Sequence, residues 1–173
     1  VPGVILADAT DQTSMFLKSD GSLWGMGQRG YGQFGNGVTV PSVAAAPIQI
    51  GTNIVAFAQG GRHSLFVKSD ASLWTAGLNN QGQLGDGTTN DRNTWAQLAT
   101  GVAAVAAGGS YSLFLKFDGS LCGMGSNSQG ELGDGTTTAR SNPFQIATGV
   151  SRVSAGYWHT LFIKNDGSLW GMG

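Results

Sequence analysis

Two histidines are the side chains of this sequence best suited to proton transfer or metal binding. His63 and His159 are the only histidines, and they occupy equivalent positions of a repeated pattern. Thr13 and Tyr111 fill that position in the other copies. Two imidazoles one repeat apart could share a metal ion, because neutral imidazole is a common metal ligand. We nevertheless expect a structural role, in which each ring lies at the start of a strand, hydrogen-bonds the backbone and holds no metal.

No residues of the sequence have the placement that nucleophilic catalysis requires. The serines near histidine, such as Ser64, belong to the repeated strand pattern, so no Ser/His/Asp set stands apart from it. Cys122 is the only cysteine, which excludes an intrachain disulfide and a multi-cysteine metal cage. It replaces a tryptophan found at Trp24, Trp74 and Trp170, so we expect a buried and inert thiol packed between repeated units. We predict that the protein is not an enzyme and uses no cofactor.

Two loop motifs match ligand-binding patterns but lack the required context. Residues 25–30 read Gly-Met-Gly-Gln-Arg-Gly, which matches the dinucleotide pattern G-x-G-x-x-G. The glycine-rich segment that follows cannot form the helix that a pyrophosphate site needs. Asp86 and Asp134 each begin an Asp-Gly-Thr-Thr loop, yet calcium takes six or more oxygen ligands and each loop brings one carboxylate. We expect Asx-type turns there instead, with Asn36 in the first copy.

The composition narrows the class of partner. Charged residues make up 11% of the 173 residues, against about 25% in ordinary globular chains. Nine basic residues and ten acidic residues give a net charge of −1. A surface that binds phosphates needs several clustered lysines or arginines, and this chain has few, so nucleic-acid binding is not expected. No apolar stretch approaches the roughly 20 residues of a membrane span, and no membrane insertion is expected. The sparse charge and the Ser, Thr, Asn and Gly content suggest an extracellular or cell-envelope location.

The segments that must position these residues recur along the chain. Residues 14–27 read Ser-Met-Phe-Leu-Lys-Ser-Asp-Gly-Ser-Leu-Trp-Gly-Met-Gly, and similar segments follow at spacings of 50, 48 and 48 residues. All four lysines of the protein occupy one position of this segment: Lys18, Lys68, Lys116 and Lys164. A second block, Gly-Gln-Phe-Gly-Asn-Gly in its first copy, covers 32–37, 82–87 and 130–135. This self-similarity indicates a repeat architecture, with units at about 1–50, 51–98, 99–146 and, in part, 147–173.

Within one unit the pattern predicts four strands and no helix. Residues 102–107 are a short apolar run, and 112–116 are apolar at consecutive positions, so both faces of that second strand must be covered. Residues 121–124 follow as a third strand, and a short fourth strand at 143–146 matches 47–50 in the first unit. Four antiparallel strands in about 48 residues are typical of a β-propeller blade. We therefore predict an all-β fold of about three and a half blades.

The turn between the second and third strands carries its own prediction. Asp118-Gly119 between two strands indicates a type I′ turn, in which both central residues have positive φ. The second unit has Asp70-Ala71 instead. Because positive φ costs an alanine about 1 kcal/mol, we expect a different turn in that unit.

Three motifs of the chain resemble the repeats of the regulator of chromosome condensation family. They are residues 60–67 (Gly-Gly-Arg-His-Ser-Leu-Phe-Val), 166–171 (Asp-Gly-Ser-Leu-Trp-Gly) and 79–87 (Asn-Asn-Gln-Gly-Gln-Leu-Gly-Asp-Gly). The resemblance covers essentially the whole chain and is to a bacterial-like member or a fragment. It implies a β-propeller, which in typical members has seven blades.

The first and last units should each present an apolar sheet face to water. Repeat arrays normally cover such ends with polar caps, and no cap is visible in the sequence. We expect either that the chain is a piece of a larger propeller or that copies of it associate. Such copies could complete a ring or stack as an open filament, because head-to-tail contacts need not close.

One end of the blades is the best candidate for binding a protein. Successive connections of an antiparallel meander alternate between two ends, so the loop before the second strand and the loop after the third share one face. Positions in these loops that break the repeat are free of its packing rule and are rich in residues that suit protein interfaces. The candidate partner-binding residues are Arg29, Tyr31, Arg62, His63, Asn79, Tyr111, Asn127, Tyr157, Trp158 and His159.

Three functions remain open at this point. The first is a non-catalytic recognition scaffold that binds a protein partner with these loops, as the resemblance to secreted bacterial members of the family implies. The second is a structural element that assembles with further copies of itself. The third is guanine-nucleotide exchange on a small GTPase, which the resemblance to eukaryotic members implies. No long insertion interrupts the repeats and no basic tail precedes them, and both features disfavour the third.

Overall fold

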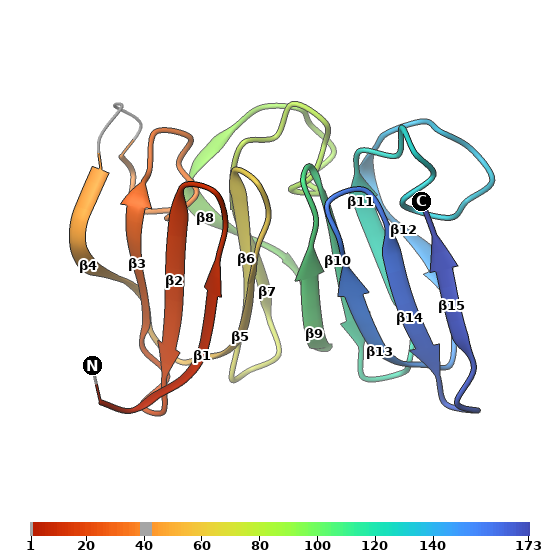
Figure 1. Ribbon diagram of the computed structural model, residues 1–173, viewed down its shortest axis with the longest axis horizontal. Helices are drawn as coiled ribbons and strands as arrows, with labels where there is room; N and C mark the ends of the chain where they lie inside the picture. Colours follow the sequence, from red (N-terminus) through yellow and green to blue (C-terminus); the bar gives the residue numbers. More distant parts are fainter. Residues whose placement is uncertain (1, 39–42) are drawn as a thin grey trace.

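The chain folds into four antiparallel β-sheets, one for each repeated unit (Figure 1). The computed structural model describes residues 2–38 and 43–173, and no helix occurs in these ranges. The strands are β1 (Val4–Ala9), β2 (Thr13–Lys18), β3 (Leu23–Gln28), β4 (Val43–Gly51), β5 (Ile54–Gln59), β6 (His63–Lys68), β7 (Leu73–Gly77), β8 (Arg92–Ala99), β9 (Val102–Ala107), β10 (Tyr111–Lys116), β11 (Leu121–Gly125), β12 (Arg140–Ala147), β13 (Val150–Ala155), β14 (Thr160–Lys164) and β15 (Leu169–Met172). Among the described residues, no helix could cross a membrane.

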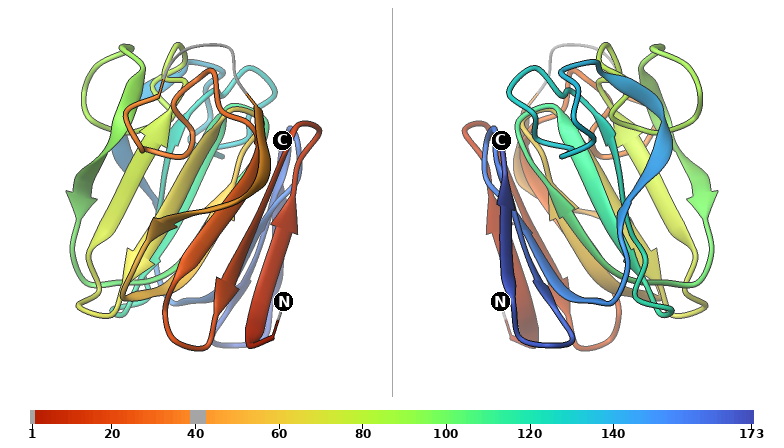
Figure 2. Two further views of the ribbon diagram at one scale, coloured as in Figure 1. Left: turned by 90° about the vertical axis from the view of Figure 1, so that its left-hand side faces the viewer. Right: turned by 90° about the vertical axis from the view of Figure 1, so that its right-hand side faces the viewer.

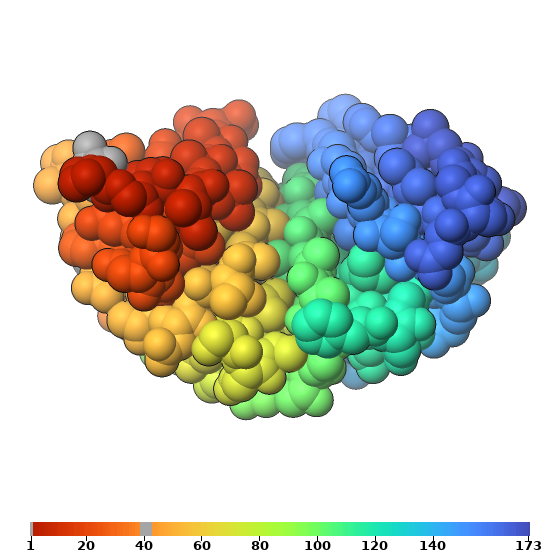
Figure 3. Space-filling model, turned by 90° about the horizontal axis from the view of Figure 1, so that it is seen from below, coloured from red at the N-terminus to blue at the C-terminus, as the bar shows by residue number. Residues whose placement is uncertain are grey.

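Each sheet is a simple meander, and the four sheets are blades of a partial propeller. Blade 1 is β1 to β4, blade 2 is β5 to β8, blade 3 is β9 to β12, and blade 4 has the three strands β13 to β15. The blades follow one another around an arc, with blades 1 and 4 at its two ends (Figure 3). The first strand of each blade lies on the inner side of the arc, where β9 contacts both β5 and β13. The strands of a blade twist relative to one another (Figure 2). This confirms the predicted all-β fold of propeller blades.

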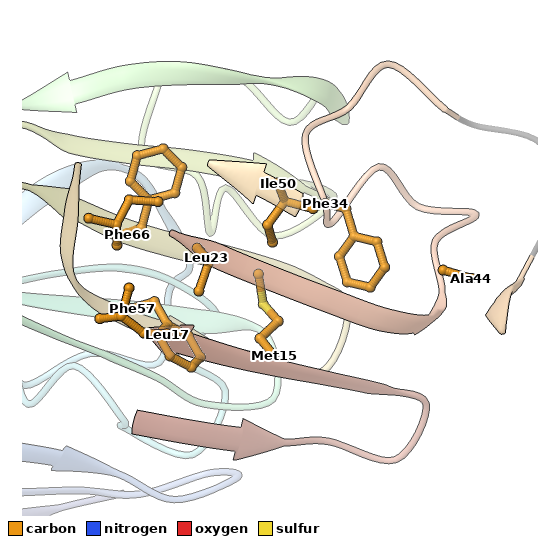
Figure 4. Packing of buried hydrophobic residues seen from close by; sticks show 9 residues of the cluster. Met15, Leu17, Leu23, Phe34, Ala44, Ile50, Phe57 and Phe66 are labelled. Atoms are coloured by element: carbon orange, nitrogen blue, oxygen red, sulfur yellow. The ribbon is translucent and has the colours of Figure 1, made fainter. Parts of the chain in front are cut away.

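The hydrophobic core lies between the blades. Blades 1 and 2 share one cluster, seen in Figure 4, which joins Met15, Leu17 and Leu23 to Phe57 and Phe66. Two further clusters fill the spaces between blades 2 and 3 and between blades 3 and 4. All side chains of β10 before its final lysine are buried, which confirms that both faces of the second strand are covered.

Alternate residues of a strand face the two neighbouring blades. In β10, Leu113 and Leu115 pack with Phe162 of blade 4. Phe114 lies between them in sequence and packs with Leu65 of blade 2. We call the side that faces the following blade the forward face, and the side that faces the preceding blade the backward face.

The turn between the second and third strands differs from the prediction. Gly119 has a φ of 82°, but Asp118 is not among the residues with positive φ. The Gly119 amide donates to the Lys116 carbonyl at 3.0 Å, and the Lys116 amide donates to the Ser120 carbonyl at 2.9 Å. A three-residue loop of this kind combines a type I turn with one left-handed residue, so the predicted type I′ turn is wrong.

The second unit uses the same turn in spite of its alanine. Ala71 has a φ of 64°, and its amide donates to the Lys68 carbonyl at 2.9 Å. Its carbonyl accepts a 3.1 Å hydrogen bond from the Val102 amide of blade 3, as Gly21 and Gly119 do from the following blades. The expectation of a different turn is therefore wrong, because the contact between blades requires the same backbone path.

The fourth strands are longer than the sequence indicates. The predicted strands at 143–146 and 47–50 lie in the C-terminal halves of β12 and β4. At the start of β12, Arg140 pairs with Gly125 of β11 across a register shift. This irregular pairing breaks the regular alternation of apolar and polar residues that indicates a strand. The N-terminal half of β12 was therefore not predicted.

Candidate functional site

The connections that precede the second strand and follow the third emerge at one end of the molecule, at the top of Figure 1. We call this end the loop face and define it by residues 10–12, 29–38, 60–62, 78–91, 108–110, 126–139 and 156–159. Loops from all four blades meet there around a cavity of about 280 Å³. Its lining residues are Asp11, Gln12, Gly61, Arg62, Leu78, Asn80, Gly109, Ser110 and Tyr157.

Backbone hydrogen bonds join these loops from blade to blade. The Gly61 amide donates to the Gly109 carbonyl at 3.1 Å, and the Gly109 amide donates to the Tyr157 carbonyl at 3.0 Å. A Cβ atom on Gly61 would lie 2.8 Å from the Gly109 carbonyl oxygen, and one on Gly109 would lie 2.7 Å from the Tyr157 ring. Only glycine allows the loops to approach this closely. The ring of Tyr157 is thereby held against a fixed backbone.

An exposed aromatic pair is the most prominent feature of the loop face. Tyr157 and Trp158 are 59% and 60% exposed, and their ring centroids lie 4.8 Å apart at an interplanar angle of 85°. On the same face the Arg62 guanidinium lies over the Tyr31 ring, 4.5 Å from its centroid. Aromatic and arginine side chains dominate the energetics of protein interfaces because they bury a large area while keeping a polar group for hydrogen bonding.

The structure leaves six of the ten candidate residues accessible. Arg62, Tyr157, Trp158 and His159 are exposed, and Arg29 and Tyr31 are half-buried. All six belong to the loop face as defined above. Asp11 and Asn80, which line the cavity, are missing from the candidate set. They lie in the same variable loops as Arg62. The criterion that selected Arg62, a position in these loops that departs from the repeat, could therefore have selected them as well.

His63 is a correction to the candidate set. Its side chain is 1% exposed between blades 2 and 3, where a partner cannot reach it. Its Nε2 lies 2.8 Å from Ser112 Oγ, which itself donates to the Gln83 carbonyl at 2.8 Å. Nε2 is therefore the donor of the first bond. Burial lowers the pKa of His63 to about 4, which favours the neutral ring. The expected position at the start of a strand is confirmed, but the ring bonds the Ser112 hydroxyl, and its Nδ1 is buried without a hydrogen-bond partner among the described residues.

Tyr111 is a second correction, because it is buried between blades 3 and 4. Its Oη lies 3.0 Å from the Gly156 carbonyl, 2.5 Å from the His159 carbonyl and 3.3 Å from Thr160 Oγ. Burial raises the pKa of the phenol to about 12. The side chain joins two blades and cannot contact a partner.

Asn79 and Asn127 are the third and fourth corrections. Both are fully buried at the base of the long loops that precede the fourth strands. Asn79 Oδ1 accepts from the Leu84 amide at 2.9 Å, and its Nδ2 donates to the Thr88 carbonyl at 3.1 Å. Asn127 makes the corresponding bonds in the next blade. Each asparagine holds its loop closed instead of facing a partner, because it satisfies backbone groups that would otherwise be buried without partners.

The two Asp-Gly-Thr-Thr loops use their carboxylates internally. Asp86 Oδ1 accepts from the Thr88 amide at 3.0 Å, which confirms the predicted Asx turn, and its Oδ2 accepts from Arg92 Nε at 2.5 Å. Asp134 makes the matching ion pair with Arg140. A hydrogen bond from the Thr136 hydroxyl is the main cause that lowers the pKa of Asp134. Within residues 2–38 and 43–173, no three His, Cys, Asp or Glu side chains gather as a metal site requires.

Two other chemical candidates have structural positions. Residues 25–30 run from β3 into turns, and no helix follows to aim amides at a phosphate. Cys122 is buried between blades 2 and 3, as expected, and burial raises the pKa of its thiol. A thiol with a raised pKa is a weak nucleophile at neutral pH.

Comparison with known proteins identifies the repeats. A family model described as "Regulator of chromosome condensation (RCC1) repeat" matches residues 70–115 and 118–163, and a second model of that description matches 54–83. No curated protein sequence matches the chain.

Solved structures show the same fold. Human WBSCR16 is 22% identical with a TM-score of 0.87, and the match covers 98% of this chain and 48% of that one. Prp20p from Saccharomyces cerevisiae is 18% identical with a TM-score of 0.81, over 98% of this chain and 44% of that one. A structure of Kap60 bound to yeast RCC1 (Prp20) matches at 21% identity and a TM-score of 0.80, over 97% of this chain and 43% of that one. This chain thus spans about half the length of these solved chains.

Proposed function

We propose, for a chain that belongs to the regulator of chromosome condensation (RCC1) repeat family, that it is a non-catalytic recognition module whose loop face binds a protein partner. The observation that carries the proposal is the exposed Tyr157–Trp158 pair, in which Tyr157 lies against Gly109 and lines the cavity. Rigid aromatic side chains lose little conformational entropy on binding, so most of the energy of burying them contributes to affinity.

The chemistry of the loop face suits a protein better than a nucleic acid. Arg62 and Asp11 bring opposite charges to one cavity, whereas a phosphate-binding surface needs several cations together. The chain as a whole carries a net charge of −1. An exposed aromatic pair with polar side chains around it is typical of a protein-binding surface.

The structural neighbours support the proposal in a general way. One of them, yeast RCC1 (Prp20), is solved in complex with Kap60, and the binding of Prp20p to Gsp1p and histones has been described with its structure. Propellers of this type can therefore serve as protein-binding scaffolds. The partner of the present chain and its extracellular or cell-envelope location stay predictions.

The proposal is tested by removing the aromatic pair. Tyr157→Ala/Trp158→Ala should abolish the capture of a protein that the unchanged chain enriches from an extract of its source, measured by quantitative mass spectrometry. Phe117→Ala is the matched control, because Phe117 is an exposed aromatic residue in a β2–β3-type hairpin at the opposite end, between β10 and β11. Circular dichroism should show the same sheet content in all three proteins. Equal enrichment by the double variant would contradict the proposal.

The non-catalytic part of the proposal has its own test. Release of labelled nucleotide from a panel of small GTPases should proceed at the same rate with and without the chain. Faster nucleotide release in the presence of the chain would indicate guanine-nucleotide exchange, the third alternative. It would contradict the proposed non-catalytic function.

A further inference from the structure

One backbone position of the loop face is held in the same way in blades 1, 2 and 3 but carries a different side chain in each. It is the residue just before β2, β6 and β10: Gln12, Arg62 and Ser110. Its carbonyl accepts a 2.9 Å hydrogen bond from the amide that follows the last glycine of the third strand, which for Arg62 is the Leu78 amide. The repeat thus fixes the backbone here, and the side chain is free to differ between blades.

Arg62 is the charged residue of this set, and a neighbouring blade restrains its side chain. The guanidinium lies 4.5 Å from the centroid of the Tyr31 ring, which belongs to the long loop of blade 1. The Tyr31 amide donates to Gln33 Oε1 at 3.1 Å, and Nε2 of the buried Gln33 donates to the Gln28 carbonyl at 2.9 Å. A guanidinium that is restrained in this way loses less conformational entropy when it binds a partner.

The hydrogen-bond donors of this guanidinium are unused. The two ion pairs within the described part of the chain hold Arg92 and Arg140 against aspartates of their own loops. Arg62 makes no ion pair and no side-chain hydrogen bond with any described residue. An aromatic ring is not a strong acceptor, so the N–H groups of Arg62 remain available for a carboxylate, which a guanidinium can bind with two parallel hydrogen bonds.

The cavity of the loop face also contains one negative side chain. Among the described residues that line this cavity, only Asp11 and Arg62 are charged, and they form no ion pair with each other. Asp11 would repel a second carboxylate near it, because like charges in a partly enclosed site are weakly screened. The cavity therefore favours a single carboxylate at Arg62 over a cluster of acidic groups.

We propose that the loop face recognises an acidic side chain of its protein partner, an aspartate or glutamate whose carboxylate pairs with Arg62. This inference rests on the proposed function and names the chemistry of the partner at that site. Gln12 and Ser110 line the same cavity and offer neutral hydrogen-bonding groups on either side of the acidic residue. A charge pair that the surrounding contacts shield from water contributes to affinity and selects against a partner with a basic residue at that place.

Selection from a library of random displayed peptides tests the proposal. The unchanged chain should enrich sequences that contain Asp or Glu. Arg62→Gln should lose this acidic preference, because it cannot pair with a carboxylate, yet it should still select peptides that depend on Trp158. Arg152→Gln is the matched control, because Arg152 is exposed and lies outside the loop face, and it should keep the preference. Circular dichroism should show the same sheet content in all three proteins.

A selected peptide measures the pair directly. Isothermal titration calorimetry should show that Arg62→Gln weakens binding about tenfold to a hundredfold, and that replacing the acidic residue of the peptide by its amide does the same. Making both changes together should weaken binding no more than either change alone, because each removes the same contact. Arg62→Lys should bind more weakly than the unchanged chain, since lysine keeps the charge but lacks the planar fork.

The possible outcomes separate this inference from the proposed function. Peptides that require Trp158 but lack an acidic residue would overturn the role of Arg62 and leave protein binding in place. An acidic preference that persists in Arg62→Gln, or additive losses in the calorimetry, would also overturn it. Acidic peptides that need Arg62 but bind Tyr157→Ala/Trp158→Ala with unchanged affinity would support the pairing and contradict the role of the aromatic pair. A library from which the chain selects nothing would count against both.

Discussion

At the scale of single residues, Ala71 shows a local preference overridden by a neighbouring blade. The other three turns of this type have glycine with positive φ, at Gly21, Gly119 and Gly167. Ala71 adopts the same conformation, with a φ of 64°. Asp70 Oδ1 accepts from the amide and hydroxyl of Ser72 at 2.9 Å and 2.5 Å, which holds the turn in place. The strain of a left-handed alanine is therefore stored in an otherwise well-formed hairpin.

Ala71→Gly should stabilise the protein. Glycine relieves about 1–2 kcal/mol of left-handed strain and loses up to about 1 kcal/mol through its more flexible unfolded chain, so the free energy of unfolding should rise by about 1 kcal/mol. Urea denaturation measures this from the midpoint at constant slope. The matched control is Gly119→Ala, whose Cβ would make ordinary contacts no closer than 3.4 Å and which should lower stability by a similar amount. A lower midpoint for Ala71→Gly would refute the explanation.

At the scale of the blade, polar groups are built into the apolar interfaces. His63, Tyr111 and Thr160 are buried with hydrogen-bond partners on adjacent blades. A buried polar pair of this kind adds little net stability but penalises every wrong neighbour. Each pair thus contributes to how two neighbouring blades dock, because a side chain of one blade meets a hydroxyl of the next.

The buried histidine predicts how stability depends on pH. The pKa of His63 is about 4 when folded and 6.5 when exposed, so the unfolded chain binds a proton first as the pH falls. Its contribution is fully present above pH 6.5 and is lost between pH 6.5 and about 4. The expected loss is about 1.4 kcal/mol per pH unit and about 3 kcal/mol in total. Urea denaturation at several pH values should show this loss in the unchanged chain and not in His63→Gln.

The comparison of the two proteins isolates the histidine. Carboxylates whose pKa is lowered, such as Asp134, also destabilise the fold in acid, but both proteins contain them, so their effect cancels in the comparison. An identical slope in His63→Gln would show that another group causes the pH dependence.

At the scale of the whole molecule, contacts between blades hold the arc together. Each of the three hydrophobic clusters joins two neighbouring blades, and β9 contacts both β5 and β13. The free energy of unfolding of one blade therefore depends on its neighbours, as in other repeat proteins.

The strands, their grouping into blades and the face on which the variable loops meet could all be predicted from the sequence. These features depend on local patterns, such as the consecutive apolar residues of 112–116 and the spacing of the four lysines. The alternation of connections between two ends follows from antiparallel pairing alone, which places Arg62 and Tyr157 on one face. Two of the wrong candidates, Asn79 and Asn127, kept the repeat, so their recurrence already indicated a structural role.

Only the tertiary structure decided which of the candidate residues are exposed to solvent. His63 and His159 are the same residue at the same repeat position, yet one is buried and the other exposed. The difference arises because blade 3 covers the forward face of blade 2, whereas no blade among the described residues covers that of blade 4. Burial depends on what lies across an interface, and a pattern along one strand carries no information about that neighbour.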